Sequence, residues 1–200
     1  IADLSHRFGL NSIPAHPSLS VALGAYEVGL LDLTGAYQVF QSGGLRTPPY
    51  LIAQITTSDG EILYRNSPEP AARVYDVANA GEMVRMLTGV ITHGTGTGAD
   101  IGRLAAGKTG TSQDWRDAWF VGFTSDYTTG VWIGYDDGSA MNHMSGASAP
   151  SARTRTDGEG SQAAAAARPG ACRCRSRRQR DLARPSAPRQ RPARLPSLKL

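Results

Sequence analysis

Cysteine, clustered histidine and long apolar runs are all missing from the first 150 residues of this 200-residue chain. Both cysteines, Cys172 and Cys174, lie near the C-terminus, so no disulfide can form within residues 1–150. The four histidines lack the spacing of metal ligands, and we predict neither a metal site nor a cofactor. No apolar run approaches the roughly 18 residues needed to cross a bilayer, and Ile1 opens no targeting signal. We therefore expect a piece of a longer chain, with any membrane anchor upstream.

Charge divides the chain into two unlike parts. Residues 1–150 contain 8 Lys and Arg against 14 Asp and Glu, a net charge of −6. Residues 151–200 contain 13 Lys and Arg against 3 acidic residues, a net charge of +10. The sequence pI of about 9.3 is therefore a property of the C-terminal part and says nothing about the partners of the rest.

Composition changes abruptly after Gly146, and we predict one domain at 1–146 and a disordered stretch at 147–200. The second stretch is rich in Arg, Ala and Pro and has no hydrophobic periodicity, so it cannot bury a core. A basic arm of this kind could bind nucleic acid. The same composition also results when a GC-rich gene is translated out of frame. We favour that interpretation and expect no nucleic-acid partner.

Helices and an antiparallel sheet are predicted within residues 1–146. Apolar residues recur at helical spacing over Tyr26–Gln41, and Val77–Thr92 has one clearly apolar face with Asp76 or Asn79 as its N-cap. Asp59-Gly60 is typical of a hairpin turn. The expected strands are Tyr50–Thr57, Glu61–Tyr64, Leu104–Thr111, Ala118–Thr124 and Thr129–Tyr135. Helices followed by three antiparallel strands indicate an α+β fold.

Residues 102–109 match the phosphate-binding pattern G-x-x-x-x-G-K-[ST] at every fixed position. A phosphate-binding loop needs a buried strand before it and a helix that begins near the lysine. The residues before Gly102 are mostly Gly, Thr and Ala, and those after Lys108 include Gly110 and have no apolar face. A nucleotide-binding protein therefore stays an alternative, but the sequence on both sides of residues 102–109 does not support it.

A second interpretation of the same segment begins at Lys108-Thr109-Gly110-Thr111. Acyl transfer needs a cation and hydroxyls to receive a substrate carboxylate, and a backbone N–H to stabilise an oxyanion. A strand that ends in these four residues can supply all three. Gly110 would leave the strand bare enough for a substrate backbone to lie beside it.

Longer blocks around this motif resemble the end of class A penicillin-binding transpeptidases. The resemblance covers roughly residues 1–146 and is carried by five blocks: Ala36–Gly44 with Pro48–Ile52, Val90-Ile91 with Gly94-Thr95-Gly96, Lys108–Asp114, Asp117–Phe123 and Val131–Asp137. It implies a partial serine β-lactamase/transpeptidase-like fold with the antiparallel C-terminal strands of the central sheet. The motifs S-x-x-K and S-x-N, which the resemblance leads us to expect, are both absent from this chain. We expect them upstream of Ile1.

The resemblance implies a role for each residue of the motif. Lys108 is predicted to set the electrostatics of the missing serine and to attract the substrate carboxylate. Thr111 is predicted to provide one oxyanion-hole N–H and, like Thr109, a carboxylate-binding hydroxyl. Gly110 and Ser112 are predicted to contact substrate, although Ser112 has no S-x-x-K partner and is not the expected nucleophile.

The implied function is that of a peptidoglycan D,D-transpeptidase that cross-links stem peptides and is acylated by β-lactams. The implied location is the periplasmic face of the bacterial inner membrane, with a glycosyltransferase domain upstream. A β-lactamase or a D,D-carboxypeptidase of the same fold is an alternative, and a non-catalytic penicillin-binding-like module is another. This chain alone is expected to be inactive, because it lacks the nucleophile.

The two interpretations of residues 102–109 make opposite predictions about nucleotides. We expect no binding of Mg-ATP or Mg-GTP, because the strand and helix that a phosphate-binding loop requires are not predicted here. Isothermal titration of the purified chain checks this. A micromolar dissociation constant would overturn the transpeptidase interpretation.

Overall fold

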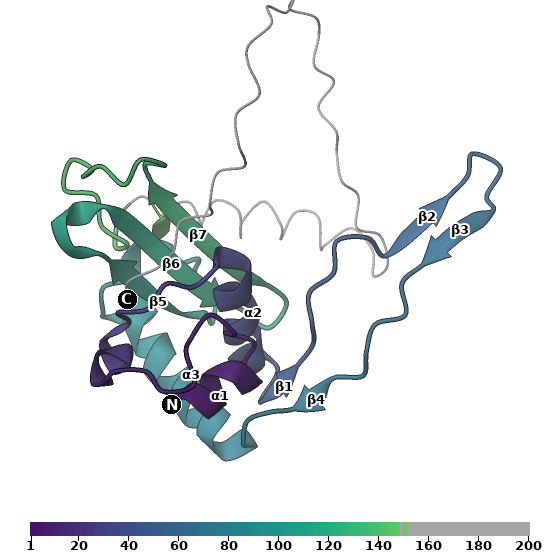
Figure 1. Cartoon of the computed structure of the whole chain (residues 1–200), viewed down its shortest axis with the longest axis horizontal. Coiled ribbons are helices and arrows are strands. Elements are labelled where there is room, and N and C mark those ends of the chain that lie inside the picture. The colour runs from purple at the N-terminus through teal and green to yellow at the C-terminus, as the bar shows by residue number, and fades with distance from the viewer. Residues whose placement is uncertain (149, 152–200) are drawn as a thin grey trace, which may run out of the picture.

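The structure is a computed structural model that describes residues 1–148, 150 and 151 (Figure 1). The stretch predicted to be disordered, residues 147–200, lies almost entirely outside the described residues. The described residues contain three α-helices, short 3-10 turns and three antiparallel sheets, as expected for the α+β class.

The C-terminal strands form the predicted three-stranded antiparallel sheet. Its strands are β5 (Ala106–Thr111), β6 (Asp117–Phe123) and β7 (Thr128–Gly134), in the order β5-β6-β7. β5 begins at Ala106 rather than at Leu104, because the chain still turns at Gly102, whose φ is +70°. β6 is the central strand, and its residues from Ala118 to Phe123 are all buried.

An aromatic ring fixes how β5 lies against β6. Gly107 of β5 pairs directly with Gly122 of β6. A Cβ on Gly107 would lie 2.7 Å from Cζ of Phe120, and one on Gly122 would lie 2.6 Å from Cε1 of the same ring. The Phe120 ring therefore covers both glycines, and a side chain at either position would displace it.

Two of the three helices cover the sheet. α2 (Leu30–Gln41) packs against β6 and β7, whereas α3 (Val77–Thr92) packs against β5 and against α2 (Figure 1). Phe8, the C-cap of α1 (Ala2–Arg7), joins a buried group with Ala36 and Val39. The main core joins α2 to β6 and contains Ile13, Val28, Leu33, Trp119 and Val121.

The start of α2 differs from the prediction. The helix begins at Leu30 and not at Tyr26, because Gly29 is an N-cap in extended backbone with φ −68° and ψ 144°. The extended segment before it brings Val28 into the main core, where 5% of its surface is exposed. Burial of Val28 in the core therefore delays the start of the helix, although the apolar residues from Tyr26 onward have helical spacing.

The remaining short elements connect these parts. The 3-10 turns are η1 (Leu19–Leu23), η2 (Thr97–Ala99) and η3 (Gln113–Trp115). β1 (Leu45–Arg46) pairs with β4 (Ala72–Arg73), a pairing that the sequence did not predict. β2 (Gln54–Thr56) and β3 (Ile62–Arg65) form the predicted hairpin around Gly60, whose φ is +91°.

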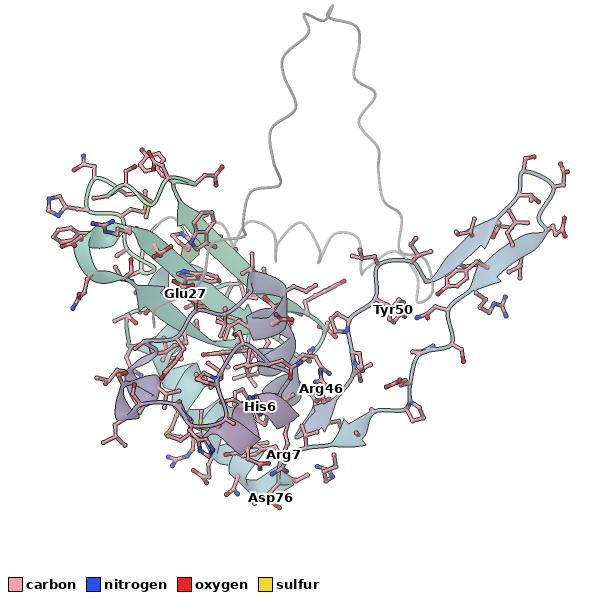
Figure 2. All side chains as sticks on the ribbon, in the orientation of Figure 1. His6, Arg7, Glu27, Arg46, Tyr50 and Asp76 are labelled. Carbon is pink, nitrogen blue, oxygen red and sulfur yellow. The ribbon has the colours of Figure 1, made fainter. Side chains whose placement is uncertain are left out.

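That hairpin projects away from the helices and the sheet (Figure 1). Every residue of β2 and β3 is exposed, including the apolar residues Ile55, Ile62 and Leu63. Tyr50, on the segment that leads into the hairpin, is exposed as well (Figure 2).

Asp76 is the N-cap of α3, whereas the sequence left Asp76 and Asn79 both open (Figure 2). Its Oδ1 accepts hydrogen bonds from the backbone N–H of Ala78 at 2.9 Å and of Asn79 at 3.0 Å. These bonds satisfy two donors that the first helical turn leaves without helical partners.

We predict that Asp76→Ala lowers the free energy of unfolding by about 1 kcal/mol, because two helix N–H groups lose their acceptor. Asn79→Ala is the matched control. It should cause no loss, since residue 79 is an exposed helix position where alanine is favoured. Urea unfolding followed by circular dichroism measures both. Equal losses in the two variants would contradict the assignment of the cap.

Candidate functional site

β5 presents Lys108-Thr109-Gly110-Thr111 at the edge of the sheet. The strand pairs with β6 on one side, and in the described part of the chain no strand pairs with its other side. A strand edge with free backbone groups can accept an extended peptide by strand addition. This is the placement that the sequence predicts for a substrate backbone beside Gly110.

A cavity of about 710 Å³ opens at this strand. Lys108 to Thr111 form one wall, and the other walls are apolar side chains of η1, α2 and α3. These apolar residues are Val21, Ala22, Leu23, Tyr37, Met83, Met86, Leu87 and Val90. The volume lies in the range of small-molecule sites, and the mixture of apolar walls with a few polar groups is typical of them.

Lys108 is the single lysine of the first 150 residues. Its Nζ donates a hydrogen bond to the backbone carbonyl of Thr109 at 2.7 Å. Within residues 1–148, 150 and 151 no carboxylate lies at ion-pair distance from it. The ammonium therefore reaches the cavity without an internal anion, and its charge is available to an anionic ligand.

The two motif threonines are held by different loops. Thr109 is buried, and its Oγ1 lies 2.6 Å from Oγ1 of Thr95, in the loop after α3. Thr111 is exposed, and its Oγ1 accepts a hydrogen bond from the backbone N–H of Gly146 at 3.1 Å. A Cβ on Gly146 would lie 2.1 Å from the carbonyl oxygen of Trp119, so only glycine fits beside the strand there.

Ser112 is drawn into the turn that leads to β6. Its hydroxyl accepts a hydrogen bond from the backbone N–H of Asp117 at 2.7 Å, and its side chain is nearly buried. Asp117 in turn accepts a hydrogen bond from the Trp132 indole N–H at 3.0 Å. These contacts of Asp117 order the turn. Substrate contact by Ser112 stays a prediction.

The loop after Ser112 has a strained backbone. Asp114 and Trp115 have φ values of 59° and 51°, in the left-handed region that non-glycine residues rarely adopt. The Trp115 ring packs on the imidazole of His143 with centroids 4.2 Å apart, and Trp115 accepts a backbone hydrogen bond from Met141. Residues 141–146 thus hold both this loop and the end of β5.

The geometry does not match a phosphate-binding loop. Lys108 and Thr109 lie inside a strand, and no helix begins beside them among the described residues. The cluster of N–H groups that a helix N-terminus offers to phosphate is therefore not formed here.

Comparison with known proteins decides the family. Residues 12–154 match the family described as penicillin binding protein transpeptidase domain. The chain belongs to this family. Penicillin-binding protein 1A of Aquifex aeolicus is 41% identical over 149 residues, which cover 74% of this chain and 20% of that protein. The predicted resemblance to class A penicillin-binding proteins is thereby confirmed, and the chain spans about a fifth of this relative's length.

Solved penicillin-binding proteins confirm the fold. The Mycobacterium tuberculosis PonA1 protein in complex with penicillin V has a TM-score of 0.68 at 26% identity, over 79% of this chain and 48% of that one. Penicillin-binding protein 1A of Haemophilus influenzae has a TM-score of 0.67 at 23% identity, over 84% of this chain and 31% of that one. The predicted transpeptidase-like α+β fold is therefore correct.

Two residues of this candidate site were not predicted from the sequence. Thr95 was noted only within the stretch Gly94-Thr95-Gly96, and Gly146 only as the point where composition changes. Their contacts with Thr109 and Thr111 join residues 14 and 35 positions apart. The only sequence signal for Thr95 was its position between two glycines before the Lys-Thr-Gly strand.

Tyr37 of α2 lines the cavity opposite β5, and burial raises the pKa of its hydroxyl to about 12. The folded state thus favours the protonated phenol more strongly than the unfolded state does, whose tyrosine pKa is about 10. The resulting stabilisation is complete below pH 10 and is lost as the pH rises from 10 to 12.

We predict that wild-type chain loses more stability than Tyr37→Phe between pH 9.5 and 11.5, by about 1–2 kcal/mol. Urea unfolding at both pH values measures the difference. Tyr50→Phe, at an exposed position, serves as the control and should keep the wild-type pH dependence. An identical pH dependence in Tyr37→Phe and wild type would refute the assignment.

Proposed function

We propose that this chain supplies the substrate-binding strand of a serine D,D-transpeptidase that cross-links peptidoglycan stem peptides. The observation that carries the proposal is the edge strand Lys108–Thr111, which forms one wall of the cavity of about 710 Å³. Family membership and the similarity to penicillin-binding protein 1A support it. The description of the matching family as a transpeptidase domain favours a transpeptidase over a β-lactamase or a carboxypeptidase.

The proposed reaction has two acyl-transfer steps. A serine supplied by an S-x-x-K segment outside this chain attacks the penultimate D-Ala carbonyl carbon, and the C–N bond to the terminal D-Ala breaks. An amine of a neighbouring stem peptide then attacks the ester carbonyl, forms the cross-link and releases the serine. β-Lactams acylate the same serine, but the ring nitrogen that leaves the carbonyl stays tethered to the acyl group, so the space that the acceptor amine would enter is not vacated.

The residues of β5 act on charge in this scheme. The Thr111 backbone N–H stabilises the oxyanion that develops on the attacked carbonyl, and the Lys108 ammonium attracts the terminal carboxylate. Gly110 is buried against the Gly146 backbone, and the donor peptide lies along the free edge of the strand beside it. Lys108 thereby places a positive charge inside a part of the chain whose net charge is negative.

The proposed location is the periplasmic face of a bacterial inner membrane, with a glycosyltransferase domain and an anchor in other parts of the protein. This location rests on the class A relatives. No helix in residues 1–148 and 150–151 combines the length and the hydropathy of a membrane span.

Labelling with a fluorescent penicillin tests the proposal. The 200-residue chain alone should not be labelled, because it contains no S-x-x-K. In a chimera, residues 12–146 replace the matching segment of the Aquifex aeolicus protein, and that protein supplies the sequences on both sides of the replaced segment. This chimera should be labelled.

In that chimera, Lys108→Ala should slow acylation by roughly 10²-fold, as removal of one preorganised electrostatic group does in other acyl-transfer sites. Arg85→Ala is the matched control, because Arg85 is an exposed cation of α3 that pairs with Glu82. It should leave labelling unchanged. Stoichiometric labelling of the 200-residue chain would contradict the conclusion that this chain lacks the nucleophile. Loss of that labelling in Ser112→Ala would then identify Ser112 as the acylated serine.

A further inference from the structure

Residues 47–71 form an arm that projects from the helices and the β5-β6-β7 sheet (Figure 1). The pairing of β1 with β4 closes its base, and the hairpin of β2 and β3 forms its tip. The two segments between base and tip do not pair with each other, and they contain four exposed prolines, Pro48, Pro49, Pro68 and Pro70. Proline has a fixed φ and no backbone N–H to donate to a neighbouring strand. The prolines therefore act as spacers between the hairpin and the rest of the described chain.

The two outer edges of the hairpin differ in how well they are protected against strand addition. On the β3 side lie the charges of Glu61 and Arg65, and the register with β2 skips Leu63, which leaves a bulge. Charged side chains and bulges are the means by which natural sheets block pairing at an edge. Residues 50–57, by contrast, contain no charged residue and no proline. Among the described residues no strand pairs with the outer edge of β2, so this edge is open to a further strand.

The hairpin also carries apolar side chains that the other described residues leave accessible. Ile55 and Ile62 have 44% and 45% of their surface exposed, and Leu63 has 64%. The turn between the strands contains Asp59 and is followed by Glu61, so an anionic lipid surface would repel the tip. A protein strand therefore fits the hairpin better than a membrane surface does.

A second copy of β2 is complementary to the open edge. When two copies pair antiparallel about a two-fold axis at Ile55, each Ile55 lies opposite Ile55 of the second copy, and Gln54 lies opposite Thr56 of the second copy. Paired β-branched apolar residues stabilise neighbouring strands. Gln54 and Thr56 already act as donor and acceptor within one strand, at 2.9 Å. None of these residues is charged, so two chains whose residues 1–150 carry a net charge of −6 can meet here without opposing like charges.

We propose that the arm is a self-association element, in which β2 pairs with β2 of a second copy to make a four-stranded sheet in the order β3-β2-β2-β3. A two-fold axis is the commonest symmetry of soluble homo-oligomers, and it uses the same edge of both chains. The four prolines would then keep the two β5-β6-β7 sheets apart on opposite sides of the new sheet. This inference goes beyond the proposed function and does not rest on it, because the arm lies away from β5 (Figure 1).

Sedimentation velocity of the 200-residue chain over a dilution series tests the proposal. Wild type should form a dimer with a dissociation constant on the order of 10–100 μM, because the interface is smaller than a standard one. Ile55→Lys places two like charges opposite each other across the two-fold axis, and Ile55→Asp does the same with the other sign. Each variant should weaken dimerisation roughly 10-fold or more. An equimolar mixture of the two variants should recover the dimer, since lysine then faces aspartate.

Leu63→Lys is the matched control, because it places the same charge on the protected strand of the same hairpin. Its dissociation constant should stay within about threefold of wild type. All measurements are made at about 0.5 M salt. Residues 151–200 carry a net charge of +10 and residues 1–150 a net charge of −6, and salt screens the attraction between them.

The chimera described above extends the test to a chain that contains the sequences on both sides of residues 12–146. It should dimerise with the same dependence on Ile55. Penicillin labelling of the Ile55→Lys chimera should equal that of the wild-type chimera, since the arm lies away from β5 (Figure 1). A wild-type chimera that dimerises but is never labelled would refute the proposed function and still support the role of the arm.

Four results would overturn the proposal. A wild-type chain or chimera that stays monomeric over the whole dilution series would show that β2 takes no second copy. A dimer that Ile55→Lys leaves unchanged would place the interface elsewhere, and an equal loss in Leu63→Lys would assign it to β3. A mixture of Ile55→Lys and Ile55→Asp that stays monomeric would show that residue 55 does not face its own copy.

Discussion

The antiparallel pairing of β5 with β6 is the constraint on which the remaining structure depends. It runs from Ala106 opposite Phe123 to Thr111 opposite Ala118, and β6 is buried on both of its faces. A slip by one residue would exchange the two faces of β5, and it would place a side chain where the Phe120 ring now covers Gly107 and Gly122. The position of Lys108 and the threonines at the sheet edge follows from this register.

Much of the fold could be predicted because its determinants are local. Val77–Thr92 has an apolar face along its whole length, and it forms a helix with those bounds. The hairpin around Asp59-Gly60 is present because glycine adopts a positive φ there. The pairing of β1 with β4 could not be predicted, because each strand has two residues and the pairing joins chain segments more than 25 residues apart.

The site shows the same division. The common position of Lys108 and Thr109–Thr111 on the edge strand could be predicted because they are consecutive residues of one strand. Thr95 and Gly146 act through contacts made across the fold, and neither residue type alone indicates such a contact. The start of α2 was predicted four residues too early, since burial of Val28 is a tertiary effect that spacing along the chain does not contain.

The projecting hairpin gives the chain two regions of very different local stability. Its backbone bonds are formed mainly within β2 and β3, and no residue of either strand is buried. An isolated two-stranded hairpin is only marginally stable in water, so it can open while the β5-β6-β7 sheet stays closed. Amide hydrogens of residues 54–65 should then exchange with solvent orders of magnitude faster than those of β6. Exposed apolar strands of this kind can also pair with other chains, so the hairpin is a place at which aggregation of the protein can begin.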